Sequence, residues 1–335
     1  MRRKEHLVRT YVIGAAGAAI LFAPLTGIGT AAAQVYPSRP ITVIVSYAAG
    51  GSVDVIARLI AERMRVSLGQ PVIIENVGGA NGTIGTGRVA RAAPNGYTLV
   101  LGLLSTHVLN GAVYPLPYDV LNDFEPISLI ADSPQVIVAK KAMPAKDLNE
   151  LIAWLKANPD KASLGSAGAG SPGHLAGVFF QQQTGTRFQF VPYRGIALAT
   201  QDLVAGQIDM MITSPIVSLP PARAGSIKAY AVTARNRLAA APDIPTANEA
   251  GLPRFYTSSW FALWAPKGTS KTVVGKLNAG VVDALADPAV RKRLGDLGLE
   301  LFPREQQTPE ALAAFHKAEI EKWWPIIKAA GIKVK

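Results

Sequence analysis

Short apolar runs alternate with amphipathic segments along most of the chain, and this alternation predicts a series of strands and helices. Apolar runs bounded by Gly, Pro or Asn are typical of buried strands. Such runs cover residues 41–46, 72–75, 98–102, 136–139, 163–166, 188–192, 209–213 and 228–233. Between the early runs, apolar residues recur three and four positions apart, as on one face of a helix. They are Val53, Ile56, Ile60 and Met64, and then Leu148, Leu151, Ile152 and Leu155.

Strands that alternate with helices indicate an α/β fold with two mostly parallel, doubly wound sheets. We interpret residues 127–139 and 227–234 as two strands that cross between lobes. This interpretation predicts one lobe from residues 36–135 and 232–335, and a second lobe from 136–231. Two crossings form a hinge, and the cleft between hinged lobes is the expected place for a small ligand.

The first 33 residues have the form of a secretory signal peptide. A basic start over residues 2–9 is followed by a short apolar run at 11–23. Residues 31–33 then offer an A-x-A cleavage site before Gln34. The apolar run is too short to span a bilayer comfortably. The pattern therefore predicts export with a cleavable signal peptide.

The chain contains no cysteine. An exported chain without cysteine has no disulfides and no thiol chemistry, which favours the bacterial periplasm over a eukaryotic extracellular setting. The formal net charge is +11, and +8 remains once the four cations and Glu5 of the signal peptide are removed. This balance is typical of a soluble basic protein or of one that steers anionic small molecules. The cations are scattered, without a basic run interleaved with aromatics, so a nucleic-acid partner is not expected.

Two predicted strands run into glycine-rich turns that lead into helices. The first is ITVIVSYAAGGSVDVI at residues 41–56, and the second is LGSAGAGSPGHL at 164–175. Each places backbone N–H groups, small side chains and hydroxyls at a helix N-terminus, which carries about half a positive charge. Together they predict two jaws that close on a carboxylate-bearing ligand. The candidate ligand-binding residues in these turns are Ala49, Gly50, Gly51, Ser52, Asp54, Ser166, Ala167, Gly168, Gly170, Ser171 and His174.

Five further candidates lie near other predicted strand ends. Ser105 and Thr106 add hydroxyls after the third strand. Tyr193 and Arg194 follow a strand in VPYRG, and such an arginine either pairs bidentately with a carboxylate or is a surface cation. Asp209 begins an apolar strand and is either a buried, hydrogen-bonded acid or a cleft residue.

Several of these candidates also have a plain structural interpretation. Asp54 complements the dipole of the first helix, and beside a bound carboxylate it points aside, binds water or meets a ligand amino group. His174 either lines the cleft or is hydrogen-bonded to backbone beneath its loop, and His316 is expected to be solvated. No histidine has a second ligand at metal-binding spacing, so no metal is expected. Aromatics at 260–264 are expected to pack in the core or, as an alternative, to form a cleft wall.

Two enzyme patterns match only in part. Residues 168–173 read G-x-G-x-x-G, but no acidic residue follows about twenty positions later, so neither dinucleotide binding nor another cofactor is expected. Residues 169–173 differ from a nucleophile elbow at the first glycine. Only His174 and His316 follow the serine, and neither completes a triad. The sequence favours a non-enzymatic protein, with a serine hydrolase that uses Ser171 as an alternative.

A succession of short motifs runs through nearly the whole chain after the signal peptide. In order, they are YPSRPI at 36–41, AGGSVD at 49–54 with Ala57-Arg58, Glu75-Asn76, GGA at 78–80, Gly82, APNGYT at 93–98, GAGSPGH at 168–174, PYRG at 192–195, GQID at 206–209, PDIPT at 242–246 and EAG at 249–251. In this succession the chain resembles the periplasmic substrate-binding proteins of tripartite tricarboxylate transporters, the Bug-type solute receptors.

The resemblance implies a two-lobed, periplasmic-binding-protein-like receptor that captures a small organic acid and delivers it to membrane transporter subunits. Ligands in the family are mostly di- and tricarboxylates, acidic amino acids and aromatic acids. It also implies that residues 49–54 and 166–174 hold one carboxylate, partly through water. At 46–48 the sequence reads Ser-Tyr-Ala where relatives often have a proline-phenylalanine pair. A ligand sensor for a membrane signalling partner is the alternative, and a monomer is expected.

Overall fold

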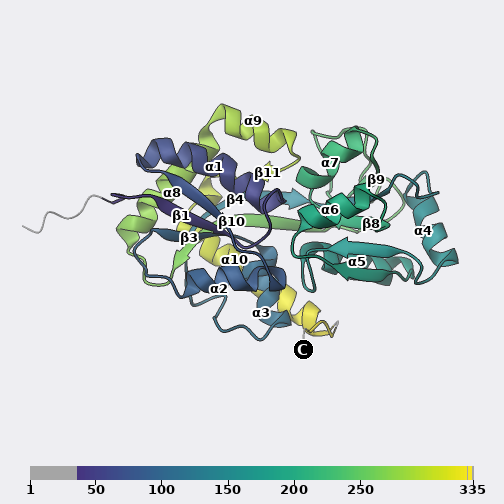
Figure 1. The fold of residues 1–335 in the computed structure, drawn as a ribbon, viewed down its shortest axis with the longest axis horizontal. Coiled ribbons are helices and arrows are strands. Elements are labelled where there is room, and N and C mark those ends of the chain that lie inside the picture. Colours follow the sequence, from purple (N-terminus) through teal and green to yellow (C-terminus); the bar gives the residue numbers. More distant parts are fainter. Residues whose placement is uncertain (1–35, 330, 334–335) are drawn as a thin grey trace, which may run out of the picture. The chain divides into compact units, whose positions relative to one another are not determined.

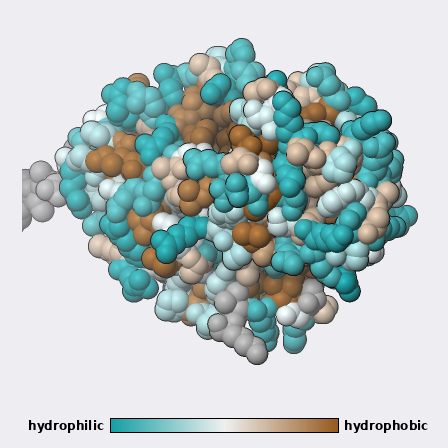
Figure 2. Space-filling view, turned by 45° about the vertical axis from the view of Figure 1, so that its right-hand side comes forward, coloured by the Kyte–Doolittle hydropathy of each residue, from teal (hydrophilic) through white to brown (hydrophobic). Residues whose placement is uncertain are grey.

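The computed structural model describes residues 36–329 and 331–333. It contains two β-sheets, each covered by helices (Figure 1). The predicted signal peptide lies outside these residues. Within them, no helix has the length and apolar character needed to cross a membrane. Figure 2 shows polar side chains over most of one face, with hydrophobic residues in several separate areas between them.

The first sheet has six strands in the order β11-β4-β10-β3-β1-β2. β1 pairs in parallel with β2 and β3, whereas β10 runs antiparallel to β3 and β4, and β11 antiparallel to β4. The strands are β1 Ile41–Val45, β2 Val72–Asn76, β3 Thr98–Leu103, β4 Phe124–Pro134, β10 Ser258–Pro266 and β11 Glu300–Leu301.

The second sheet has five strands in the order β7-β6-β8-β5-β9. β6 pairs in parallel with β7 and β8, and β5 runs antiparallel to β8 and β9. The strands are β5 Val136–Lys140, β6 Ser163–Ser166, β7 Gln189–Pro192, β8 Met210–Thr213 and β9 Ile227–Val232.

Helices pack on both faces of each sheet, because both faces of the strands are apolar. On the first sheet, α1, α8 and α9 cover one face, and α2, α3 and α10 contribute to the apolar core on the other. Around the second sheet, α4 and α5 share one core, and α6 and α7 share another (Figure 1). The helices are α1 Ser52–Leu68, α2 Thr83–Ala90, α3 Asn110–Val113, α4 Leu148–Ala157, α5 Pro172–Thr184, α6 Ile196–Val204, α7 Pro215–Arg223, α8 Lys271–Ala286, α9 Pro288–Asp296 and α10 Pro309–Ala329.

The α/β prediction is confirmed, and all eight predicted strands form within one residue at each end. The sheets are mixed, however, and not mostly parallel. The reason is the crossing strands: β4 leads into β5 with only Gln135 between them, and β5 lies antiparallel to both of its neighbours. β10 returns to the first sheet, antiparallel to β3 and β4.

The chain passes between the sheets at Gln135 and again at Thr257, directly before β10. Residues between β9 and Thr257 pack with the second sheet, since Ala247, Leu252 and Phe255 belong to its core. The predicted lobe boundaries stay a prediction. This packing supports a later crossing at Thr257 in place of the one predicted at 227–234.

Candidate ligand-binding site

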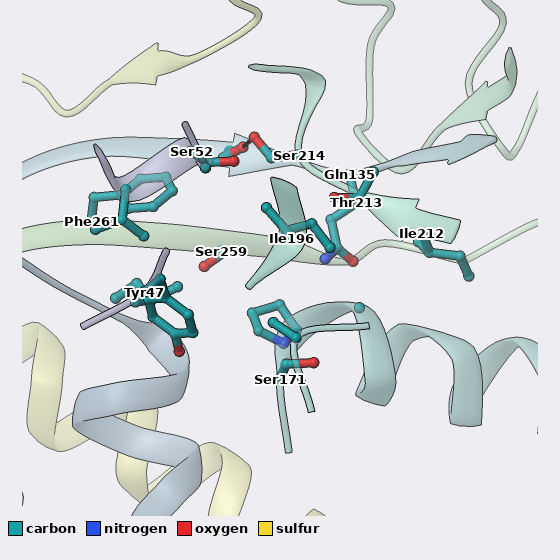
Figure 3. A pocket seen from close by; sticks show the side chains of 17 residues that line it. Tyr47, Ser52, Gln135, Ser171, Ile196, Ile212, Thr213, Ser214, Ser259 and Phe261 are labelled. Atoms are coloured by element: carbon teal, nitrogen blue, oxygen red, sulfur yellow. Dashed lines mark hydrogen bonds between the residues drawn. The ribbon is translucent and has the colours of Figure 1, made fainter. Parts of the chain in front are cut away.

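A cavity of about 70 Å³ lies where strand ends from both sheets meet the N-termini of helices (Figure 3). Its walls include Tyr47, which follows β1, and Leu103 at the end of β3. The second sheet contributes Ala167, which follows β6, and Thr213 at the end of β8. The position agrees with the general rule that ligands of α/β sheets bind beyond the carboxyl ends of the strands.

Two helix N-termini reach the cavity from the predicted glycine turns. α1 begins at Ser52, and its cap residue, Gly51, offers no side-chain acceptor to the first N–H groups. α5 begins after Ser171, whose Oγ accepts from the His174 N–H at 3.3 Å, and Gly173 in its first turn also lines the cavity. The turn before α1 passes through Gly50 at a φ of +80°, a conformation that glycine adopts without strain.

Two more helices begin at the same cavity. α6 starts at Ile196, and its cap residue Gly195 likewise has no side-chain acceptor. α7 starts after Ser214, whose Oγ accepts from the Ile216 N–H at 3.4 Å. Four helix N-termini therefore converge on one small space, and each carries about half a positive charge from its aligned peptide dipoles.

Two serine hydroxyls in the cavity wall have no hydrogen-bond partner among the described residues. Ser52 and Ser259 are only 6% and 7% exposed, and both Oγ atoms are unpaired. Figure 3 shows these hydroxyls on the cavity. A buried hydroxyl without a partner is unfavourable by roughly 1–3 kcal/mol. A bound molecule with oxygen acceptors removes that cost.

The cavity contains no charged side chain among the residues that line it. Its apolar walls come from Val53, Leu103, Ile196, Ile212 and Phe261. The polar contribution consists of hydroxyls, one amide and the N–H groups of the helix ends. An anion in this space is held by dipoles and neutral donors instead of by a lysine or arginine.

Tyr47 forms the floor and is fixed by a buried hydrogen-bond network. Its hydroxyl lies 2.7 Å from Ser105 Oγ and donates to the carbonyl and side-chain oxygens of Asn81 at 3.1 Å. Burial raises the pKa of the Tyr47 phenol above its ordinary value, so the group stays neutral. Ser105 therefore helps to hold the Tyr47 side chain in the cavity wall. The hydroxyl of Thr106 forms hydrogen bonds with the backbone of Leu103 and with the ring of His107.

Asp54 points away from the cavity. Its Oδ2 accepts from the Gly50 N–H at 2.9 Å and from Arg58 Nε at 3.0 Å, and its Oδ1 accepts from Asn76 Nδ2 at 3.0 Å. Burial acts to raise the pKa of Asp54, but the hydrogen bonds from Arg58, Gly50 and Asn76 outweigh it and lower that pKa. Of the three predicted alternatives, the structure has the carboxylate turned aside, where it fixes the glycine turn.

His174 and Asp209 are also satisfied by neighbours outside the cavity. His174 Nδ1 accepts from the Gly170 N–H at 3.4 Å, beneath the loop, and burial lowers the pKa of the ring. Asp209 forms a 2.7 Å ion pair with Lys140 and accepts from the N–H and Oγ of Ser163.

The remaining candidates also divide into residues that line the cavity and residues that do not. Tyr193 donates to Asp202 at 2.7 Å, and Arg194 is exposed and does not line the cavity. The predicted residues that line the cavity are Gly51, Ser52, Ala167 and Ser171. Those that the structure places outside its lining are Ala49, Gly50, Asp54, Ser105, Thr106, Ser166, Gly168, Gly170, His174, Tyr193, Arg194 and Asp209.

One expectation about a histidine is wrong. His316 is 2% exposed, not solvated, because α10 packs against the first sheet and brings its Nε2 to the carbonyl oxygen of His107. Among the aromatics at 260–264, Phe261 lines the cavity, whereas Trp260 and Trp264 belong to the core on the opposite face of β10.

Sequence reasoning missed several polar cavity residues. Ser214 carried a usable signal, since serine followed by proline is typical of a helix start. Gln135 and Ser259 had no such sequence signal, because Gln135 lies between two apolar strands and Ser259 lies within one. The lining residues not predicted as ligand-binding are Tyr47, Val53, Leu103, Ser133, Gln135, Pro172, Gly173, Ile196, Ile212, Thr213, Ser214, Ser259 and Phe261.

Several known proteins are similar to this chain in sequence and in fold. Residues 56–332 match the family model of the tripartite tricarboxylate transporter family receptor. The chain is 36% identical to BugT of Bordetella pertussis over 305 residues, which are 90% of this chain and 93% of that protein. The structure of the periplasmic binding protein BugD superposes with a TM-score of 0.86 at 40% identity, covering 89% of this chain and 100% of BugD.

Two similar structures contain organic acids. MatC from Rhodopseudomonas palustris, solved with malate, has a TM-score of 0.83 at 40% identity, over 87% of this chain and 100% of MatC. Another R. palustris protein, solved with adipate, has a TM-score of 0.85 at 33% identity, over 89% of this chain and 100% of the other. These matches confirm both the two-lobed, periplasmic-binding-protein-like fold and the resemblance noted in the sequence. The chain belongs to the tripartite tricarboxylate transporter receptor family.

Proposed function

We propose that this protein is an extracytoplasmic receptor that captures a small carboxylate-bearing ligand between its two sheets. The observation that carries the proposal is the neutral cavity at which four helices begin, with the unpaired hydroxyls of Ser52 and Ser259 in its wall. A carboxylate there accepts hydrogen bonds from N–H groups and hydroxyls without requiring a cation. The relatives solved with malate and adipate support an organic acid as the ligand class.

Capture works through closure of the two sheets around the acid. α1 belongs to the first sheet and α5, α6 and α7 to the second, so an anion between their N-termini contacts both sides. The ligand stabilises the closed form only by binding it better than the open form. The predicted signal peptide and the family support a periplasmic location and delivery of the closed, loaded form to membrane transporter subunits.

The surroundings of Ser171 support a binding role instead of catalysis. Its Oγ accepts from the backbone N–H of His174, as a helix cap does. The Nδ1 atom of the same histidine accepts from the Gly170 N–H, so this ring nitrogen is not available as a base for the hydroxyl. A nucleophilic serine needs a base within hydrogen-bond reach.

A thermal-shift screen of the chain from Gln34 tests the function. The protein is unfolded and refolded to remove host ligand, then heated with malate, adipate, succinate, citrate, aspartate, glutamate and nicotinate. An acid at 100 times its Kd stabilises the folded state by about 2.7 kcal/mol, which raises the Tm.

Two variants serve as the matched pair in that screen. Ser52→Ala removes a cavity hydroxyl and is expected to reduce the shift, whereas Lys156→Ala, on the exposed side of α4, leaves it unchanged. A folded protein that no acid stabilises contradicts the proposal, as does a Ser52→Ala variant that shifts like the wild type.

A further inference from the structure

Three chain segments are tied together where the chain passes between the sheets. The Thr233 N–H donates to the Gln135 carbonyl at 2.8 Å, and the Gln135 N–H donates to Thr233 Oγ1 at 2.8 Å. The hydroxyl of Thr257 donates to Gln135 Oε1 at 2.9 Å. Gln135 therefore contacts both other segments, and any bending between the two sheets acts on it.

The crossing strands have a different cavity on each face. Strand alternation turns Ser133, Gln135 and Ser259 toward the ligand cavity. Asp132 and Ser258, one position away on the same strands, line a second cavity of about 400 Å³ on the other face. Gln135 is thus the one of the three tied residues that reaches the ligand cavity, since Thr233 and Thr257 line the other one.

The side-chain amide of Gln135 is oriented by this arrangement. Its Oε1 is occupied by the Thr257 hydroxyl, which leaves the Nε2 hydrogens to face the cavity. Within the described part of the chain, Nε2 donates to no protein atom. Figure 3 shows Gln135 on the cavity beside Thr213 and Ile196. An amide nitrogen only donates, so it forms hydrogen bonds with ligand oxygens, which accept, and forms none with an ammonium group.

We propose that Gln135 couples ligand binding to closure, with its Nε2 donating to an oxygen of the bound acid while its Oε1 and backbone hold the crossing segments. This inference rests on the proposed function. It makes Gln135 a specificity residue that selects an oxygen acceptor at its end of the cavity. It makes Thr257 a positioning residue, which orients the amide without lining the ligand cavity.

The test uses three variants and one control, with malate and adipate as probes in titration calorimetry. Gln135→Glu keeps the side-chain shape and an acceptor for Thr257 but loses the donor and adds a repelling charge. Gln135→Met also loses the bond to Thr257. Both are expected to weaken binding of the better probe by roughly 10- to 100-fold. Thr257→Val is expected to weaken it about 3- to 10-fold, and the control Ser258→Ala by less than twofold.

A second readout follows the two sheets directly. Because the chain has no cysteine, Val66→Cys on α1 and Lys156→Cys on α4 give one exposed labelling site on the helices of each sheet. Distances between spin labels are then measured by pulsed electron paramagnetic resonance, with and without acid. At saturating acid, the wild type is expected to show only the shorter distance between the labels. The Gln135→Met protein is expected to keep a fraction of molecules at the longer distance.

Two outcomes overturn the proposal. If both Gln135 variants bind the probe within twofold of the wild type and close fully, Gln135 has no coupling role. If neither acid binds the wild type, the proposed ligand class has failed. The distances between the spin labels without acid then test the role of Gln135. Gln135→Met and Thr257→Val then have to broaden the distance distribution relative to Ser258→Ala, and equal widths reject the coupling.

Discussion

The hydroxyl of Tyr114 donates a 2.8 Å hydrogen bond to the carbonyl oxygen of Ala169. Tyr114 follows α3, which packs on the first sheet, and Ala169 lies in the glycine turn before α5 of the second sheet. Asn81 donates to the same carbonyl at 3.2 Å. The turn that carries Ala167 and Ser171 is therefore hydrogen-bonded to two residues on the side of the first sheet.

Tyr114→Phe removes one of these bonds without changing the ring. We expect ligand to dissociate about 2- to 10-fold faster, because a hydrogen bond contributes roughly 0.5–1.5 kcal/mol and this one joins the two sides, so it has to break when they separate. The association rate stays the same. Stopped-flow displacement of a bound acid measures both rates, and an unchanged dissociation rate means that the bond does not stabilise the closed form.

Ser52→Ala and Ser259→Ala are expected to weaken ligand binding without lowering the stability of the folded protein. Both hydroxyls are buried and unpaired, so their removal leaves the free energy of unfolding of the ligand-free protein unchanged or higher. Affinity for the acid falls, by about 1–3 kcal/mol for a hydroxyl that contacts charge. Urea unfolding and calorimetry measure the two effects. Ser171→Ala is the contrast, because it also removes a helix cap and costs about 1 kcal/mol of stability.

Asp132→Asn is expected to stabilise the protein at neutral pH. Asp132 faces Glu300 directly across the β4–β11 pair. Burial, with the charges of Glu300 and Glu319, raises its pKa to about 6, although hydrogen bonds from Ser258 and Ser133 act to lower it. Because the folded pKa exceeds the ordinary value of 3.8, the ionised carboxylate destabilises the folded state above pH 6 and not below about pH 4.

The gain from Asp132→Asn is at most about 3 kcal/mol at pH 7.5 and disappears near pH 4. Urea unfolding at the two pH values measures it. A variant that is less stable than the wild type at pH 7.5 contradicts the prediction.

The three histidines in residues 36–335 are expected to make the folded protein less stable on acidification. Burial lowers the pKa of His107, His174 and His316, and the charge of His316 lowers that of His107 further. Below pH 6.5 the unfolded chain binds protons that the folded protein does not. The free energy of unfolding therefore falls as pH falls, by up to about 1.4 kcal/mol per pH unit for each histidine.

The Asp132→Asn background removes the carboxylate whose raised pKa opposes the effect of the histidines near pH 6. In that background, His316→Gln is expected to remove about one third of the slope between pH 6.5 and 5. Denaturant unfolding across the interval gives the slope. An unaltered slope means that His316 takes up its proton in the folded state.

Local patterns in the sequence were sufficient for eight of the strands and for the two glycine turns that lead into α1 and α5, whereas β10 and β11 were not among the predicted strands. Ser52 and Ser171 were found because glycine turns followed by capping residues are local signals. Asp54, His174 and Asp209 look equally functional in sequence, yet partners such as Arg58 and Lys140 satisfy two of them away from the cavity. Sequence alone does not reveal such pairings.

Sequence alone also does not tell which face of a buried strand lines the cavity. β10 is apolar on both sides, so nothing in the sequence separates Phe261, which lines the cavity, from Trp260, which packs under α10. The same holds for Gln135, whose role depends on two segments about a hundred residues later in the chain. Those contacts exist only after both sheets have formed.

The cavity walls are uncharged, while residues 36–335 carry a net charge of +8. Dissolved salt acts on these two features differently. Ions screen exposed charges over about 10 Å at 0.1 M, so rising ionic strength slows the arrival of an anionic acid. The helix dipoles and hydroxyls that surround the acid afterwards are shielded from those ions, so its residence time stays the same. How often the receptor fills and how long it stays filled are therefore controlled by separate parts of the molecule, the surface cations and the helix ends.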